Sequence, residues 1–125
     1  VSSARPNSTR SQTFMRRDAE RLQDIFEAIK RIQDRADLDQ IENDEMLQVW
    51  VLYHLQIIGE AARALSSELK QNYSQIPWSK IIGLRNRVVH EYFDIDLDIV
   101  IDIVIYDLPD LREQIKGILN DFTDS

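Results

Sequence analysis

The chain has 125 residues, 43% of them hydrophobic, with 22 acidic against 15 basic side chains and no cysteine. The length and hydrophobic fraction fit one globular domain rather than a disordered tail. The lack of cysteine excludes a fold held by disulfides and a thiolate-bound metal site. No apolar run is long enough to span a membrane. The formal charge of −7 argues against binding of nucleic acid through a broad basic surface. We therefore expect a cytoplasmic protein that is not held in a membrane.

The first residues differ in composition from the rest of the chain. Residues 1–14 are rich in Ser, Thr, Asn and Arg, contain Pro6, and have no apolar period. We expect a flexible leader or a remnant of an expression sequence there, with Met15 as the native first residue. A single domain would then span residues 15–125.

Helices are predicted for the first half of that domain. Apolar side chains recur every three or four residues over residues 16–36, while charged side chains fill the other positions. Asn43 or Asp44 is expected to cap a long second helix over residues 45–69. Gly59 lies inside this helix at a cost of ~1 kcal/mol relative to Ala, which indicates that another helix passes close to the backbone there.

The second half of the domain contains one ambiguous segment. A third helix is predicted to start at Pro77 or Ser79 and to end near His90, followed by a polar break in which Asp96 can cap the next helix. The run 99–105 is rich in β-branched residues, which is typical of a strand.

A lone strand would have no partner elsewhere in this chain, so we expect a buried helix over residues 97–108 instead. Pro109 is then expected to break or kink the chain before a last helix over residues 110–122. The predicted architecture is all-α, an antiparallel bundle of four to five helices.

Two candidate sites carry little support. Residues 94–98 resemble the start of a calcium loop, but the required glycine and glutamate are replaced by Ile99 and Ile105. His54 is a lone histidine on a mostly apolar helix, so we expect it to be a core or interface residue. We therefore predict no metal and no cofactor.

The densest group of polar side chains lies in residues 85–92. It contains Arg85, Asn86, Arg87, His90, Glu91 and Tyr92. On an ideal helix Arg85 and His90 would point ~140° apart, so a site that uses both requires the helix to end near His90 or a second copy of the segment to face the first. Spacing alone leaves an alternative open, in which Arg87 pairs with Glu91, His90 caps the helix and Tyr92 packs on the core.

Arg85, His90 and Tyr92 form an Arg-x4-His-x-Tyr motif, which resembles the motif of HEPN-domain ribonucleases and specifically of the HepT-like toxins. The similarity in order and spacing is strongest over residues 57–98. Glu91 departs from the pattern, which more often has a small residue at that position. Two further segments are similar to this family: Ile58-Gly59-Glu60-Ala61 and Ile76-Pro77-Trp78.

This resemblance implies a helical HEPN bundle that forms a homodimer in which the two motif segments face one cleft. It also implies a metal-independent endoribonuclease acting on cellular RNA. His90 would transfer a proton near neutral pH, Arg85 would stabilise charge on the phosphoryl oxygens, and Asn86 would orient His90 or the phosphate.

The resemblance implies a partner as well, a nucleotidyltransferase antitoxin of the MNT type that attaches AMP to Tyr92 in a type VII-like toxin–antitoxin module. We add the hypothesis that Glu60 pairs with Arg85 or Arg87 and orients the guanidinium. The competing interpretation is a non-catalytic HEPN dimer, in which the same residues form a pocket that binds a nucleotide or a protein partner.

Overall fold

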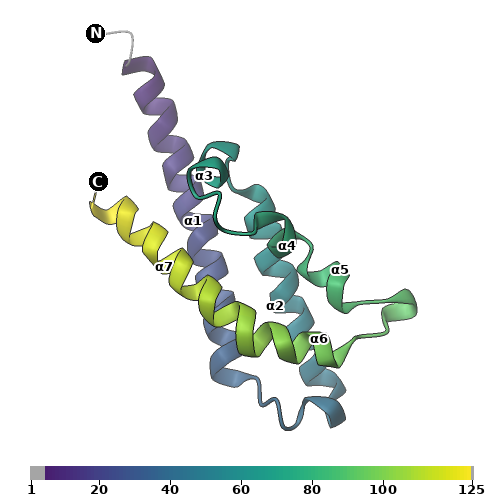
Figure 1. Ribbon diagram of the computed structural model, residues 1–125. Helices are drawn as coiled ribbons and strands as arrows, with labels where there is room; N and C mark the ends of the chain where they lie inside the picture. Colours follow the sequence, from purple (N-terminus) through teal and green to yellow (C-terminus); the bar gives the residue numbers. More distant parts are fainter. Residues whose placement is uncertain (1–4, 125) are drawn as a thin grey trace.

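Three long helices form the body of the computed structural model (Figure 1). The structure describes the backbone of residues 5–124 and the side chains of residues 16–123. Helix α1 (Arg5–Arg35) runs antiparallel to α2 (Glu45–Ala64), and α7 (Leu108–Asp124) packs along α1. Four shorter helices lead from α2 to α7: α3 (Ser67–Asn72), α4 (Trp78–Ile82), α5 (Leu84–Val88) and α6 (Leu97–Asp102).

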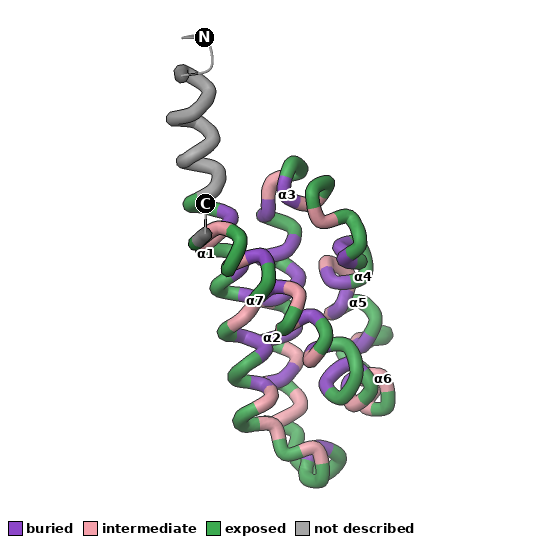
Figure 2. The backbone as a smooth tube through the Cα atoms, turned by 60° about the vertical axis from the view of Figure 1, so that its left-hand side comes forward, coloured by how far each residue is buried: buried purple, intermediate pink, exposed green. Residues whose placement is uncertain are grey.

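The core lies where the inward faces of α1, α2 and α7 meet (Figure 2). The 3.6-residue period places one apolar stripe of each helix on this side. Fully buried side chains come from all three stripes: Leu22, Ile25, Ile29, Ile32, Val51, Leu55, Ile58, Leu108 and Ile115. No strand occurs in the described residues, and the predicted all-α bundle is confirmed.

Three sequence-based expectations about single residues are confirmed. Asp44 caps α2 by accepting a hydrogen bond from the Leu47 amide at 3.0 Å. The backbone of α4 does pass close to Gly59, because a Cβ atom there would lie 2.9 Å from the carbonyl oxygen of Ile82. His54 is a buried residue whose Nδ1 lies 2.8 Å from the carbonyl oxygen of Trp50.

The second helix ends earlier than predicted. Helix α2 stops at Ala64, where the chain becomes extended before Ser66 caps α3. The buried carboxylate of Asp18 fixes this break, because it accepts the Ser66 amide at 2.9 Å and the Ser66 hydroxyl at 2.6 Å. The contact joins residues far apart in the sequence, so helical periodicity gave no sign of it.

The third predicted helix is split and also ends early. Helices α4 and α5 are separated at Gly83, and α5 ends at Val88 rather than near His90. The segment from Val89 to Asp96 then forms a loop that projects from the bundle (Figure 1). We call it the motif loop, because it carries the end of the Arg-x4-His-x-Tyr motif.

The β-branched run forms the predicted helix, because burial outweighs its strand propensity. Val100, Ile103 and Val104 are buried within α6 and the π-helical turn Ile103–Asp107. Pro109 was expected to break or kink the chain, and the break is wrong, since Pro109 lies inside α7; a kink there stays a prediction. The wider turn, in which the Leu108 amide donates to the Ile103 carbonyl, lets the helix continue past a residue that has no amide hydrogen.

The segment expected to be a flexible leader overlaps the start of α1, and its flexibility stays a prediction. Helix α1 begins at Arg5, so residues 5–14 are helical, while residues 1–4 lie outside the described residues. Whether residues 1–14 precede the native start stays a prediction.

Candidate functional site

The Arg-x4-His-x-Tyr motif lies at the end of α5 and in the motif loop. Two backbone hydrogen bonds close the base of this loop: the His90 amide donates to the Asp94 carbonyl, and the Asp96 amide donates to the Val88 carbonyl, both at 2.7 Å. Because the helix stops at Val88, the chain turns between Arg85 and His90. This is one of the two arrangements that a site using both side chains requires.

The tip of the motif loop has an unusual backbone conformation. Tyr92 and Phe93 have φ angles of 57° and 59°, in the left-handed region that non-glycine residues rarely adopt. The left-handed conformation of each residue raises the free energy of the folded chain by roughly 1–2 kcal/mol. Their side chains point outward, with 98% of Tyr92 and 73% of Phe93 exposed. The alternative in which Tyr92 packs on the core is therefore wrong.

The two arginines of the motif have different partners. The Arg85 guanidinium lies 5.7 Å from the centroid of the Phe93 ring, so it contacts the motif loop through a cation–π interaction. Arg87 forms an ion pair with Asp107 at 3.6 Å, which joins α5 to the π-helical turn. The pairing of Arg87 with Glu91, which belonged to the alternative that spacing left open, is not formed among the described side chains.

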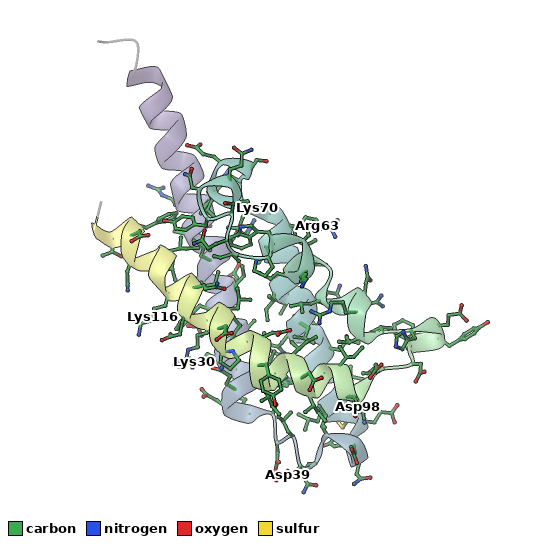
Figure 3. The ribbon with its side chains drawn as sticks, viewed as in Figure 1. Lys30, Asp39, Arg63, Lys70, Asp98 and Lys116 are labelled. Atoms are coloured by element: carbon green, nitrogen blue, oxygen red, sulfur yellow. The ribbon has the colours of Figure 1, made fainter. Side chains whose placement is uncertain are left out.

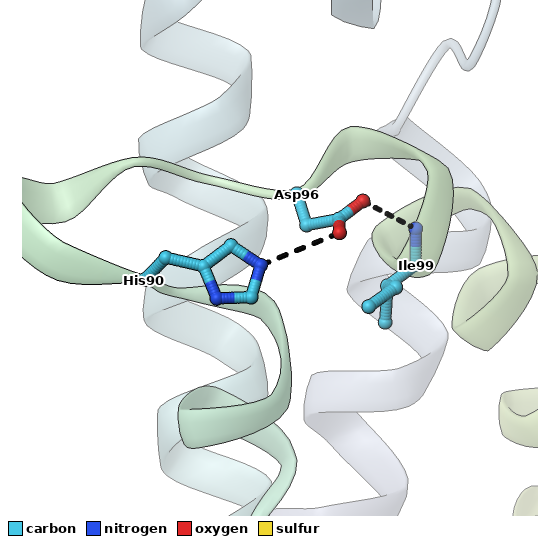
Figure 4. Close-up of polar contacts among 3 residues, drawn as sticks. All are labelled: His90, Asp96 and Ile99. Atoms are coloured by element: carbon cyan, nitrogen blue, oxygen red, sulfur yellow. Dashed lines mark hydrogen bonds and ion pairs between the residues drawn. The ribbon is translucent and has the colours of Figure 1, made fainter.

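His90 contacts an acidic side chain that closes the other end of the motif loop. Its Nε2 lies 3.4 Å from Oδ2 of Asp96, while Oδ1 of Asp96 accepts the Ile99 amide at 3.2 Å and caps α6 (Figure 4). The Ile99 amide, and then His90, hold the pKa of the Asp96 carboxyl below its usual value. The predicted cap is thus confirmed, and the contact of the same carboxylate with His90 is an addition.

Glu60 and Asn86 line a shallow cavity that Arg85 also lines, between α2 and the segment formed by α4 and α5. The cavity has a volume of about 240 Å³ and is lined by Gln56, Gly59, Glu60, Arg63, Ile82, Arg85 and Asn86. Glu60 accepts a hydrogen bond from the Gln56 side chain, one helical turn away, at 3.1 Å. Among the described side chains it forms no ion pair with Arg85 or Arg87, so the hypothesised pairing is not formed.

The motif residues therefore lie together at the end of α5 and in the motif loop. No hydrogen bond joins Arg85 to His90 among the described contacts. Arg85 touches Phe93, and His90 touches Asp96, so both contact the same loop. Helical spacing did not reveal either partner. Over the side chains that the structure describes, no three His, Cys, Asp or Glu residues come together to hold a metal ion, and no described helix is long and apolar enough to cross a membrane.

Comparison with known proteins identifies similar sequences. The sequence model of the family described as ribonuclease HepT-like matches residues 22–118. A Methanocaldococcus jannaschii protein named "Putative RNase MJ1380" is 32% identical over 97 residues, which cover 78% of this chain and 85% of that protein. "Probable ribonuclease HepT" of Thermococcus cleftensis is 32% identical over 94 residues, covering 73% and 86%. No solved structure matches significantly.

Proposed function

Because the chain belongs to the HepT-like ribonuclease family, we propose that it is a metal-independent endoribonuclease that cleaves cellular RNA. The observation that carries the proposal is the presentation of the motif at the surface. The His90 side chain is 53% exposed, and Arg85 is partly exposed at the end of a helix. Both are therefore accessible to a large substrate such as an RNA strand.

His90 supports proton transfer because only one of its ring nitrogens faces Asp96. When Nε2 carries the hydrogen and donates it to Asp96, Nδ1 keeps its lone pair and can accept the proton of a ribose 2′-hydroxyl. The 2′-oxygen then attacks the adjacent phosphorus while the bond to the 5′-oxygen breaks. The leaving oxygen takes a proton from water or from a second His90, giving a 2′,3′-cyclic phosphate and a 5′-hydroxyl.

Arg85 supports the same step through its charge. Its guanidinium contacts the face of Phe93, and no carboxylate among the described side chains neutralises it. It can therefore donate hydrogen bonds to phosphoryl oxygens as negative charge builds on them. Asn86, next to Arg85 and exposed, would help to orient the phosphate.

We propose further that the protein is a toxin and that modification of Tyr92 controls it. The exposed phenol is free to attack the α-phosphorus of ATP held by an MNT-type nucleotidyltransferase antitoxin. The new bond joins the phenol oxygen to AMP, pyrophosphate leaves, and the phenol proton passes to solvent. An added AMP would bring negative charge and a bulky base beside His90, which would block the approach of an RNA phosphate.

A homodimer is also part of the proposal. Three apolar side chains on one face of α2 are exposed, Met46 at 84%, Val49 at 55% and Tyr53 at 61%. Their spacing along the helix forms a surface that a second copy can cover. Light scattering at several protein concentrations would test this, since a monomer at all concentrations would contradict it.

Intact mass and RNA cleavage together test the whole proposal. We expect the protein made with its antitoxin to gain mass in whole AMP units, and Tyr92→Phe to gain none. Only the unmodified protein should cleave RNA in excess chelator. A mass that never changes would refute the control by AMP, and intact RNA with unmodified protein would favour the non-catalytic binding module.

A further inference from the structure

The cavity beside Arg85 is lined partly by residues of α2 that lie outside the Arg-x4-His-x-Tyr motif. Four of its lining residues, Gln56, Gly59, Glu60 and Arg63, follow one face of α2, at the helical spacing of three and four residues. Arg85, together with Ile82 and Asn86, lines it from α4 and α5. We call it the Arg63 cavity, after the one residue in it that carries a cation and lies outside the motif. Figure 3 labels Arg63 on α2.

The two guanidiniums of the Arg63 cavity lack acidic partners. The Arg63 side chain forms no hydrogen bond or ion pair among the described residues. The one described polar interaction of the Arg85 guanidinium is the cation–π contact with Phe93. The one acidic lining residue, Glu60, accepts a hydrogen bond from Gln56 and forms no described ion pair with either arginine, so the two guanidiniums outnumber the single carboxylate. A chain with a formal charge of −7 thus places two unpaired cations at one small cavity, which is the arrangement expected for an anion-binding site.

The cavity is held in place by close backbone packing. Gly59 lies against the carbonyl oxygens of Ile81 and Ile82, so α2 and α4 cannot move closer together at this point. This contact fixes the distance between the helix that carries Arg63 and the segment that carries Arg85. The backbone segments that carry the two arginines are therefore held side by side.

We propose that the Arg63 cavity is an RNA subsite, in which Arg63 binds the phosphodiester next to the one that Arg85 contacts. This inference rests on the proposed ribonuclease function and assigns its substrate a second point of contact. Successive phosphates along a single strand present the repeated negative charge that two separated guanidiniums can bind. It also explains how an acidic protein holds RNA: the cations are concentrated at the cleavage site.

Binding of a non-cleavable RNA tests the subsite without requiring catalysis. Fluorescence anisotropy would measure binding of a labelled 2′-O-methyl oligoribonucleotide to the unmodified full chain at several salt concentrations. Arg63→Ala should weaken binding roughly five- to tenfold, as expected for the loss of one charge-assisted contact. The slope of log affinity against log salt should fall in magnitude by about 0.7, the value for one phosphate contact on a single strand.

Arg31→Ala is the matched control, because Arg31 is exposed on α1, has no described ion pair and does not line the cavity. It should change affinity less than twofold, and Arg63→Lys should keep the salt slope of the wild type. Equal salt slopes for Arg63→Ala and Arg31→Ala would overturn the subsite. If Arg63→Ala impaired only dimerisation or modification by the antitoxin and left RNA affinity unchanged, the RNA subsite would be overturned in favour of a protein-binding role for Arg63.

The two proposals fail in different ways. A wild-type protein that binds the 2′-O-methyl strand through Arg63 but never cleaves unmodified RNA would refute the ribonuclease function alone. A wild-type protein that cleaves RNA, with no change in salt slope on loss of Arg63, would refute the subsite alone.

Discussion

Two glycines in this chain are predicted to respond in opposite ways to the same substitution. Gly59 and Gly117 both lie inside helices, α2 and α7, where alanine is favoured over glycine by about 1 kcal/mol. A methyl group at Gly117 meets no side chain and no neighbouring element within 4 Å. We therefore expect Gly117→Ala to raise the free energy of unfolding by up to about 1 kcal/mol.

At Gly59 the added methyl group would lie 2.9 Å from the Ile82 carbonyl oxygen and 3.3 Å from that of Ile81. Both atoms belong to the backbone, so α4 must shift, and overpacking of this kind costs about 1–3 kcal/mol. Set against the gain in helix propensity, Gly59→Ala should be destabilised by about 0–2 kcal/mol. The two variants should thus differ by about 1–3 kcal/mol.

Urea denaturation followed by circular dichroism would measure both variants against the wild type. For a domain of this size a difference of 1 kcal/mol corresponds to roughly 3–6 °C in melting temperature, which thermal unfolding resolves. Because a shift of α4 also displaces Arg85, Gly59→Ala should lose RNA cleavage while Gly117→Ala keeps it. Equal stabilisation of both variants would refute the close approach of α2 and α4 on which the Arg63 cavity depends.

Two carboxylates provide further tests. Asp18→Ala should lower the free energy of unfolding by about 2–3 kcal/mol, because the amide and hydroxyl of Ser66 lose their buried partner. Asp24→Ala, on the exposed face of α1, is the control and should lower it by less than about 0.5 kcal/mol. Similar urea midpoints for the two variants would contradict this. The pKa of Asp96 is lowered in the folded protein, first by the Ile99 amide that it caps and then by His90. The ionised carboxylate therefore stabilises the fold at pH values above 3.8, its pKa in the unfolded chain, and this stabilisation disappears as the pH falls through the folded pKa. Asp96→Asn, which can still cap a helix, should therefore flatten the loss of stability in acid, and an unchanged pH profile of the urea midpoint would count against the contact.

Local sequence patterns were sufficient for much of this fold. The helical periods and the caps at Asp44 and Asp96 depend on residues near one another in the chain, where spacing and residue type determine the structure. The close contact at Gly59 joins two helices, and it was indicated by a glycine inside a helix, where alanine is favoured. The strand-like run 99–105 could also be assigned correctly, because a lone strand has no partner to complete its hydrogen bonds.

The differences from prediction have long-range or unusual local causes. Asp18 ends α2 from another helix, and no pattern within residues 45–69 indicates this. The left-handed conformation at Tyr92 and Phe93 uses two residue types that rarely adopt it, so the exposed motif loop could not be predicted.

The candidate site was predicted in part. The motif residues come from a resemblance to a family that the chain does belong to, but their contacts depend on how the motif loop folds. Asp96 was expected only as a helix cap, and its second contact, with His90, appears once the loop closes. Arg63 lies two residues after the matching segment that ends at Ala61, and only the cavity connects it to Arg85.

The central claim is that His90 transfers a proton in RNA cleavage, and analysis of the reaction products tests it most directly. Unmodified wild type and His90→Gln, confirmed by intact mass, would be incubated with RNA in excess chelator. We predict 2′,3′-cyclic phosphate and 5′-hydroxyl ends from the wild type, and a rate roughly 10²–10⁴-fold lower for His90→Gln. Equal rates for the two proteins, or no cleavage by the unmodified wild type, would contradict the claim.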